Sequence, residues 1–484
     1  MRGTAIAVAG ALLLTSACAV SEPPELTGQS KPTIIPVPEV TQVSDTRVPK
    51  DLKPAVSLPR EDSRHPDAGD PGVDALSYDL DLTWTPDGQR LEGVATIVLR
   101  SMRDQPSIRL DLGAALHAPQ ATVDGVTGPA DHHDDYLDID GDFRAGHLYT
   151  VRIKYDGTPQ PTKLSDGATL GVQLPKTGGL SVCEEPIGAF TWYPVNDQPA
   201  DKAFYSFTLH VPAPMVGVAN GQLQSRATSG GVTTTRWTLD RPTSSYLTTV
   251  AFGDLTQTRL GTVNGTPVST WTPTGDSYTR NRLAYADDAL RWVEDRLGPY
   301  PFASLGLLAN ADTGCGMETQ TMITLGVGEY VTSKPVIVHE IVHQWWGDEV
   351  TPNDWRDPWM NEGMAYYVQK VYEAESEHKP LDTVMADLRK QAAKSVKTDG
   401  PAGDYHGTWA LSIYDSPAVM WHEIRRKVGD REFWHLVSTW PTVHRYGSSD
   451  REELIRWWSK ESAQHLKPIF SSYLSGEAFA KTTS

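Results

Sequence analysis

One stretch of the chain, residues 336–369, constrains the fold more than any other. It contains the pattern His-Glu-x-x-His at His339, Glu340 and His343, and eighteen residues then separate His343 from Glu362. On a helix, residues four apart lie one turn above each other, so the two imidazoles share a face and can hold a single zinc ion. Glu340 lies one step round that helix, where its carboxylate can reach a water at the metal and act as a general base.

The search for a third ligand decides whether this motif is a catalytic site, because a catalytic zinc needs three protein ligands and one open position. Glu362 is the predicted third ligand, near the start of a second helix over residues 362–377. Pro335 and Gly347 predict that the first helix spans residues 335–346. Two histidines and one glutamate on antiparallel helices predict a hydrolytic zinc site, against the alternative of a chance motif on a buried helix.

The N-terminal end of the chain has the pattern of an export signal. Arg2 precedes an apolar run over residues 5–14 that is too short to span a membrane as a mature helix. Cys18 follows small residues, as in the lipobox of a bacterial lipoprotein, although an ordinary secretory signal would look similar. We therefore expect residues 1–18 to be a signal peptide, and the mature protein to be exported and anchored to the membrane through a lipid, or secreted.

Residues 19–72 differ in composition from the rest of the chain. They are rich in Pro, Ser, Asp and Lys and show no apolar periodicity, which predicts a disordered tether. The formal net charge of the whole chain is −18, and Lys and Arg are scattered, which argues against nucleic acid as a partner. After the tether about 410 residues remain, enough for two domains.

The two halves that follow have different periodicities. Residues 73–259 consist of short runs with period-two alternation, such as residues 203–211, which predict an antiparallel β domain. Residues 260–484 are dominated by helical spacing, as in residues 281–297. We expect an α+β multidomain chain in which a β domain precedes a mainly helical catalytic domain.

The stretch HEIVHQWWGDEVTPNDWRDPWMNEGMAYY resembles the gluzincin aminopeptidases of the M1 family, and the resemblance extends over roughly residues 74–476. It implies a saddle-like β domain followed by a thermolysin-like catalytic domain. It also implies zinc metallopeptidase activity on peptide substrates with a free N-terminus. Larger members of the family carry an additional helical-repeat domain, for which this sequence has no room, so we expect a more open cleft.

The same resemblance implies which residues bind the substrate. Gly316, Met317 and Glu318 resemble the family's GxMEN loop, whose Glu binds the α-ammonium of the substrate while neighbouring backbone holds the peptide. Glu185 falls where the family places a second amine anchor, and counting favours it over Glu184. An aminopeptidase needs such carboxylates, because an ammonium group must be held one residue away from a cationic metal.

A further donor is needed to stabilise the oxyanion that forms during peptide hydrolysis. The family uses a Tyr at the start of a helix, and Tyr414 and Tyr405 are the candidates. Residues 413–421 resemble the family's pattern, with Pro417 in place of Gly, and favour Tyr414. The alternative for either side chain is a buried core tyrosine.

Two cysteines, Cys183 and Cys315, lie close in sequence to the two presumed amine anchors. If Glu185 and Glu318 line one amine pocket, these cysteines should be close in space, and an exported compartment permits their oxidation. We predict a disulfide between them, with free buried thiols as the alternative.

The sequence thus favours a zinc metallo-aminopeptidase. One alternative is a zinc endopeptidase, against which the amine-anchoring carboxylates argue. A second alternative is a catalytically inactive envelope binding protein that carries zinc. The presence of Glu340 and Tyr414 argues against it, because a scaffold has no use for a general base.

Overall fold

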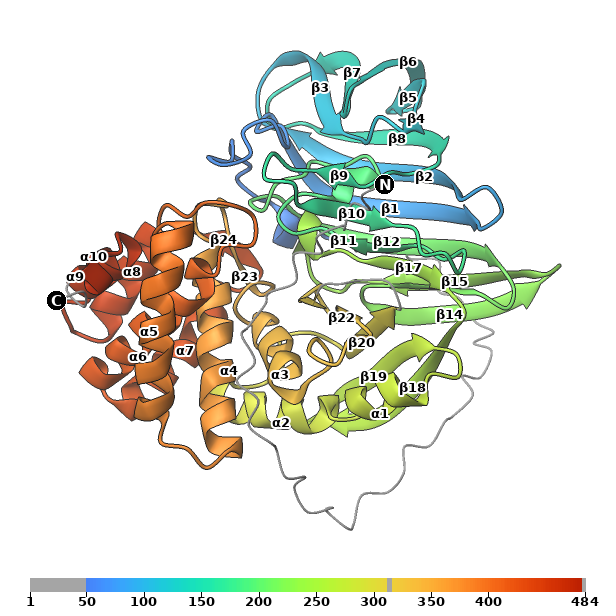
Figure 1. The fold of residues 1–484 in the computed structure, drawn as a ribbon. Helices are drawn as coiled ribbons and strands as arrows, with labels where there is room; N and C mark the ends of the chain where they lie inside the picture. The colour runs from blue at the N-terminus through green and yellow to red at the C-terminus, as the bar shows by residue number, and fades with distance from the viewer. Residues whose placement is uncertain (1–48, 311–315, 481–484) are drawn as a thin grey trace, which may run out of the picture.

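The structure is a computed structural model, and it describes residues 49–310 and 316–480 of the 484-residue chain (Figure 1). The predicted signal peptide, Cys18 and the predicted tether up to residue 48 lie outside the described residues. Within the described ranges, no helix combines the length and the apolar composition that a membrane span requires. A β-rich half is followed by a mainly helical half, which confirms the predicted fold class.

A twelve-stranded sheet forms most of the N-terminal half. Along its strand β1 (Val73–Thr85), every second side chain from Tyr78 to Trp84 is buried, which is the period-two pattern of a strand with one face in the core. Strand β1 is antiparallel to β2 (Arg90–Ser101), as predicted, but parallel to β12 (Lys202–Pro212). The sheet is therefore mixed rather than purely antiparallel.

The other strands of this half extend the sheet or form two small sheets beside it. They are β3 (Gln105–Asp111), β4 (Leu116–His117), β5 (Gln120–Val123), β6 (Val126–His133), β7 (Tyr136–Phe143), β8 (Leu148–Gly157), β9 (Thr162–Lys163), β10 (Thr169–Gln173), β11 (Ser181–Cys183), β13 (Val216–Ala219), β14 (Gln222–Ser229), β15 (Val232–Thr238), β16 (Thr243–Ser244) and β17 (Val250–Gly253). Glu185 lies two residues after the end of β11, so this small sheet positions it.

A second sheet begins the catalytic half, with its strands in the order β18-β19-β20-β22-β21. These strands are β18 (Leu255–Val263), β19 (Thr266–Pro273), β20 (Leu305–Asn310), β21 (Gly316–Met317) and β22 (Met322–Gly326), and a separate pair is β23 (Val350–Pro352) with β24 (Gly447–Ser449). The predicted domain boundary between residues 259 and 260 falls inside β18, which pairs along its length with β19.

Helix α3 lies between α4 and the strands of the second sheet, with α2 below it in the view of Figure 1, and its residues from Val336 to His343 are all buried. The helices are α1 (Ser277–Leu283), α2 (Ala286–Leu297), α3 (Lys334–His343), α4 (Glu362–Ser376), α5 (Leu381–Asp399), α6 (Ser412–Val428), α7 (Asp430–Val443), α8 (Arg451–Glu461), α9 (Lys467–Leu474) and α10 (Glu477–Ala480). The helix predicted over residues 281–297 is thus two helices. Trp345, Trp346 and Trp359 are buried in the core around α3.

Residues 49–72, the second part of the predicted tether, are not a tether in the structure. Residues 57–70 are held by the β-rich half at both ends and contact the catalytic half in the middle, and we call this segment the strap. Its Asp62 is 1% exposed and accepts a hydrogen bond from the backbone N–H of Trp355, at 2.6 Å. At its C-terminal end the N–H of Asp70 donates to Asn196 at 2.6 Å. The composition of this segment predicts disorder because it offers no apolar face. The strap is ordered because single polar atoms of distant residues hold it.

Candidate active site

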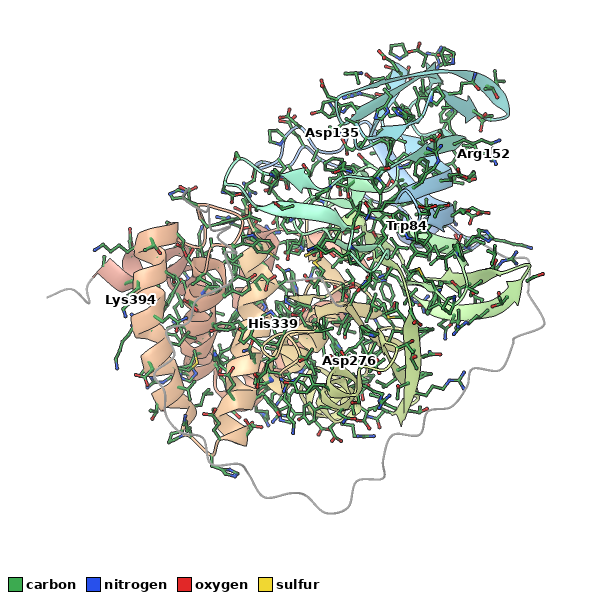
Figure 2. The ribbon with its side chains drawn as sticks, turned by 45° about the vertical axis from the view of Figure 1, so that its right-hand side comes forward. Trp84, Asp135, Arg152, Asp276, His339 and Lys394 are labelled. Carbon is green, nitrogen blue, oxygen red and sulfur yellow. The ribbon has the colours of Figure 1, made fainter. Side chains whose placement is uncertain are left out.

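Two helices bring the predicted metal ligands together, with His339 deep among the side chains of the catalytic half (Figure 2). His339 and His343 lie one turn apart on α3, and Glu362 is the first residue of α4. Pro335 occupies the first turn of α3, where its missing N–H leaves no hydrogen bond unmade. The helix ends at His343 rather than at residue 346, because the chain then enters a tight turn.

The three side chains converge closely. The Nε2 atoms of His339 and His343 are 3.0 Å apart, and each is 3.3 Å from Oε2 of Glu362. Nδ1 of His343 lies 3.0 Å from the carbonyl oxygen of Trp346. Because a carbonyl oxygen can only accept, Nδ1 carries a proton and Nε2 turns toward the other two ligand atoms. All three side chains are at most 10% exposed, so water screens them little.

The charges at this site also fit a cation. Burial would lower the pKa of His343, but the charges of Glu318 and Glu362 outweigh burial and raise the pKa well above 6.5. Burial would raise the pKa of Glu362, but the two histidines outweigh it and lower the pKa to about 2. The surroundings thus stabilise positive charge between these groups. Two imidazoles and one carboxylate form the donor set of a hydrolytic zinc site, and the residues present fit a zinc ion.

Glu340 lies beside the convergence point and faces the outermost strand of the second sheet. Burial raises the pKa of Glu340 well above 4.5, and the neighbouring carboxylates add to this shift. The backbone of Gly316 in β21 lies against the carboxylate, since a Cβ at Gly316 would be only 2.5 Å from Oε1 of Glu340. Gly316 therefore leaves room for this carboxylate, and β21 presents its backbone, with Met317 buried behind it, beside the site.

The two predicted amine anchors come together from the two halves of the molecule. Ligand oxygens of Glu185, Glu318 and Glu362 all lie within 4.8 Å of one another. Burial raises the pKa of Glu185, and the charges of Glu318 and Glu362 raise it further. Glu184, the alternative that the sequence disfavours, is fully buried elsewhere, where its carboxylate accepts hydrogen bonds from Trp192 and Thr248. A pair of carboxylates beside the metal ligands is a site for an ammonium group.

The two candidate tyrosines have different surroundings. The ring of Tyr414 lies 6.3 Å from the ring of His339, and burial, with the charges of nearby carboxylates, raises the pKa of Tyr414 well above 10. The hydroxyl of Tyr405 instead donates to the carbonyl oxygen of Trp355 at 2.6 Å. Tyr414 therefore has its ring beside a predicted metal ligand and feels the charges of the predicted catalytic carboxylates, whereas the hydroxyl of Tyr405 is committed to the backbone.

One interaction that supports the site was not predicted from the sequence. Lys202 in β12 is 2% exposed, and its Nζ donates to the carbonyl oxygen of Asp348 at 2.8 Å, just beyond the end of α3. Burial lowers the pKa of Lys202 to about 7, although the charges of Asp348 and Glu349 oppose this shift. A lysine at the start of a strand gives no signal of its own, because its partners Asp348 and Glu349 are far away in sequence.

The predicted disulfide is described at one end. Cys183, at the end of β11, is disulfide-bonded, so the alternative of a free thiol is wrong for this residue. Cys315 lies outside the described residues, and its pairing with Cys183 stays a prediction.

Two sequence models of one peptidase family match the chain. The peptidase family M1 domain matches residues 283–473, which include the predicted metal ligands. The peptidase M1 N-terminal domain matches residues 180–247, which include Glu185. Together the two matches cover more than half of the chain. The chain belongs to peptidase family M1. In the M1 chain, the N-terminal model covers Glu185, and the M1 domain model covers Glu318. The two amine-anchor candidates therefore come from different halves.

Solved M1 structures share this fold. The M1 zinc metallopeptidase from Deinococcus radiodurans is 24% identical, with a TM-score of 0.76 over 86% of this chain and 97% of that chain. A mutant of that enzyme bound to a Tyr-Ser-Ala substrate matches with a TM-score of 0.75 and 24% identity, over 85% of this chain and 96% of that chain. Both comparisons establish the fold of the M1 chain.

The curated relatives are longer proteins. Aminopeptidase M1-B of Oryza sativa is 24% identical over 320 residues, which are 61% of this chain and 37% of that protein. Aminopeptidase N of Haemonchus contortus is 23% identical over 340 residues, which are 64% of this chain and 34% of that protein. The M1 chain thus spans little more than a third of the length of these relatives.

Proposed function

We propose that this M1 chain is a zinc aminopeptidase that hydrolyses the first peptide bond of substrates with a free N-terminus. The observation that carries the proposal is the distance between the amine anchors and the metal ligands. Oxygens of Glu185 and Glu318 lie within 4.8 Å of one another and of Glu362. An ammonium group held by these carboxylates is therefore confined to the immediate neighbourhood of the metal ligands, which restricts cleavage to the first bond.

In this proposal His339, His343 and Glu362 hold the zinc ion. When bound, zinc supplies Lewis-acid chemistry, which polarises the scissile carbonyl and makes water a nucleophile at neutral pH. Glu340 accepts a proton from the attacking water and returns it to the departing amine. The Tyr414 hydroxyl donates a hydrogen bond to the oxyanion as it forms.

Binding of the substrate backbone completes the proposed mechanism. Gly316 and Met317 place an outer strand beside Glu340, where an extended peptide can lie along the backbone. The side chains of Glu318 and Glu185 neutralise the ammonium group at its end. Together these groups fix the scissile carbonyl near Glu340 and Tyr414, which reduces the entropy that the reaction must lose.

The test is a set of initial hydrolysis rates on a series of free-amine peptides and on the N-acetylated twin of each, with and without a zinc chelator. We expect cleavage only of the free-amine series, lost with the chelator and restored by added zinc. Equal cleavage of both series would indicate an endopeptidase and remove Glu185 and Glu318 from their roles. No cleavage of either series would favour a zinc-bearing binding protein.

We also propose that the protein is exported and held at the membrane by a lipid on Cys18. The support is the apolar run over residues 5–14 and the small residues before Cys18. Mass spectrometry of the mature N-terminus tests this proposal, with a Cys18→Ala variant as the control. A diacylated Cys18 is the expected result, and an unmodified N-terminus at another residue would contradict it.

A further inference from the structure

A cavity of about 370 Å³ lies beside the candidate active site, and both halves of the molecule line it. Its volume falls in the range of roughly 300–1,000 Å³ that is typical of sites for small molecules. Glu185 and Tyr414 form part of its wall. The cavity therefore touches both the proposed amine anchor and the proposed oxyanion donor.

This position decides which part of a substrate the cavity receives, and the argument rests on the proposed function. The amino group and the scissile carbonyl of the first residue are bonded to the same Cα. If Glu185 holds the amino group and Tyr414 faces the carbonyl, that Cα lies between them, at the mouth of the cavity. The side chain of the first residue then points into the cavity.

Four large aromatic residues stand in the wall of the cavity. Trp355, Tyr405, Trp409 and Tyr414 all line it, and Trp409 is 46% exposed at its edge. Trp355 is 2% exposed and also packs in a small buried cluster with Tyr246, Leu247 and Met317. Flat aromatic surfaces bind aromatic side chains through offset or edge-to-face contacts.

The strap completes the wall. Arg64 and His65, which lie within the predicted tether, both line the cavity. The guanidinium of Arg64 lies 3.9 Å from the centre of the Tyr405 ring, which keeps its plane against the aromatic wall. Among the described residues, Arg64 forms no side-chain hydrogen bond or ion pair, so its charge is not neutralised by a carboxylate within the wall.

Asp166 also lines the cavity, and each of its two carboxylate oxygens accepts a backbone hydrogen bond. Asp166 accepts hydrogen bonds from the backbone N–H groups of Thr408, at 2.5 Å, and Ala168, at 3.0 Å. The bond from Thr408 ties a loop of the β-rich half to a loop of the catalytic half. Lys163, exposed on the same loop, adds a second positive charge to the lining. Away from the amine anchor, the cavity is therefore lined by aromatic rings, by the positive charges of Arg64 and Lys163, and by an Asp166 carboxylate whose two oxygens both accept backbone hydrogen bonds.

We infer that this cavity selects an aromatic first residue, and that Arg64 of the strap is a specificity-determining residue. An aromatic side chain contacts the aromatic rings and the guanidinium of Arg64, whereas a Lys or Arg side chain meets the positive charges of Arg64 and Lys163, and both oxygens of Asp166 already accept backbone hydrogen bonds. The strap thus makes a segment before the catalytic half part of the substrate site.

The experiment compares kcat/KM for Phe-Ala-Ala and Arg-Ala-Ala in the wild-type protein and two variants. We expect the wild-type protein to prefer the Phe peptide by about tenfold or more. Arg64→Glu should lower the Phe-to-Arg ratio by at least about tenfold, because it reverses the charge and removes the stack. Arg60→Gln is the matched control, since Arg60 is on the same strap, bonds to Asn353 and does not line the cavity.

A binding measurement separates this inference from the proposed function. Isothermal titration of free L-phenylalanine and L-arginine into the zinc-loaded protein reports on the cavity even if no peptide is hydrolysed. Tighter binding of L-phenylalanine that Arg64→Glu reverses, with Arg60→Gln unchanged, supports the inference. A wild-type preference for arginine, or a ratio that Arg64→Glu leaves within twofold, overturns it, whereas loss of hydrolysis alone overturns only the proposed function.

Discussion

Replacing Asp62 by Ala should release the strap while leaving the rest of the protein folded. Oδ1 of Asp62 accepts hydrogen bonds from the backbone N–H groups of Arg64 and His65, both at 2.9 Å, and Oδ2 accepts from Trp355 at 2.6 Å. The carboxylate thus folds the strap on itself and ties it to the catalytic half. No other side chain of the strap combines both tasks in this way.

The expected loss of stability of the strap follows from these three hydrogen bonds. A hydrogen bond to a charged group contributes roughly 1.5–3 kcal/mol. Water can replace the carboxylate at Arg64 and His65, which are only partly buried, but the N–H of buried Trp355 would lose its partner at a cost of about 1–3 kcal/mol. We expect a net loss of about 3 kcal/mol, below the 5–15 kcal/mol that typically stabilise a domain. The strap should then open on its own, with its open population raised by about a hundredfold.

Limited trypsin digestion measures that population, because cleavage after Arg60 and Arg64 requires an open strap. Asp62→Ala should be cleaved there about a hundred times faster than the wild-type protein, with an unchanged thermal midpoint for the remaining fold. Asp67→Ala is the control, since Asp67 lies on the same strap but is exposed. Cleavage of Asp62→Ala within twofold of wild type would show that the strap is not held as described.

Three further changes test the site and the β-rich half. Tyr414→Phe should lower kcat by about 10²–10³-fold while zinc content, measured by mass spectrometry, stays the same, and a loss below threefold would remove Tyr414 as the oxyanion donor. Gly316→Ala would place a Cβ 2.5 Å from Oε1 of Glu340, so kcat should fall about a hundredfold at an unchanged thermal midpoint, and full activity would refute this contact. Burial, with the charge of Asp197, raises the pKa of Asp111 to about 7, so the folded state favours its neutral form. Stability from this group is fully present below about pH 4 and is lost as the pH rises through about 7, so urea unfolding of Asp111→Asn should show a stability gain over wild type that grows from about pH 4 and levels off at a few kcal/mol near pH 7. A gain that does not change with pH would contradict this reasoning.

The metal-ligand geometry could be predicted from the sequence because it depends on local rules. The four-residue spacing of His339 and His343 places both on one helix face whatever the rest of the chain does. Glu362 needed only a second helix beginning at the right distance, and α4 begins at that residue. The convergence of Glu185 with Glu318 was different, since it links two halves of the molecule and came only from the resemblance to the M1 family.

The strap could not be predicted, because the atoms that hold it are far away in sequence. A Pro-rich segment with few apolar residues satisfies the compositional rule for disorder. It is ordered because Asp62 finds Trp355 and Asp70 finds Asn196, and neither partner leaves a mark in the strap's own sequence. The cavity wall could not be predicted for the same reason, because the residues that form it with Trp355 come from both halves of the molecule.

The choice between the two tyrosines also needed the structure. Both lie at a similar distance in sequence from Glu362, so the spacing left Tyr405 open. The hydroxyl of Tyr405 bonds to the backbone of Trp355, whereas the ring of Tyr414 lies beside His339. The predicted boundary between the halves lies within β18, which has the alternation of the first half but pairs with β19 of the second sheet.

We propose that Glu340 performs proton transfer beside a zinc site that it does not help to form. The most direct measurement is the zinc content and kcat of Glu340→Gln, determined on the same purified sample. We expect Glu340→Gln to bind one zinc ion per chain, as the wild-type protein does, and to have a kcat lower by about 10²–10⁴-fold. A variant that keeps near-wild-type kcat, or one that loses its zinc, would contradict it.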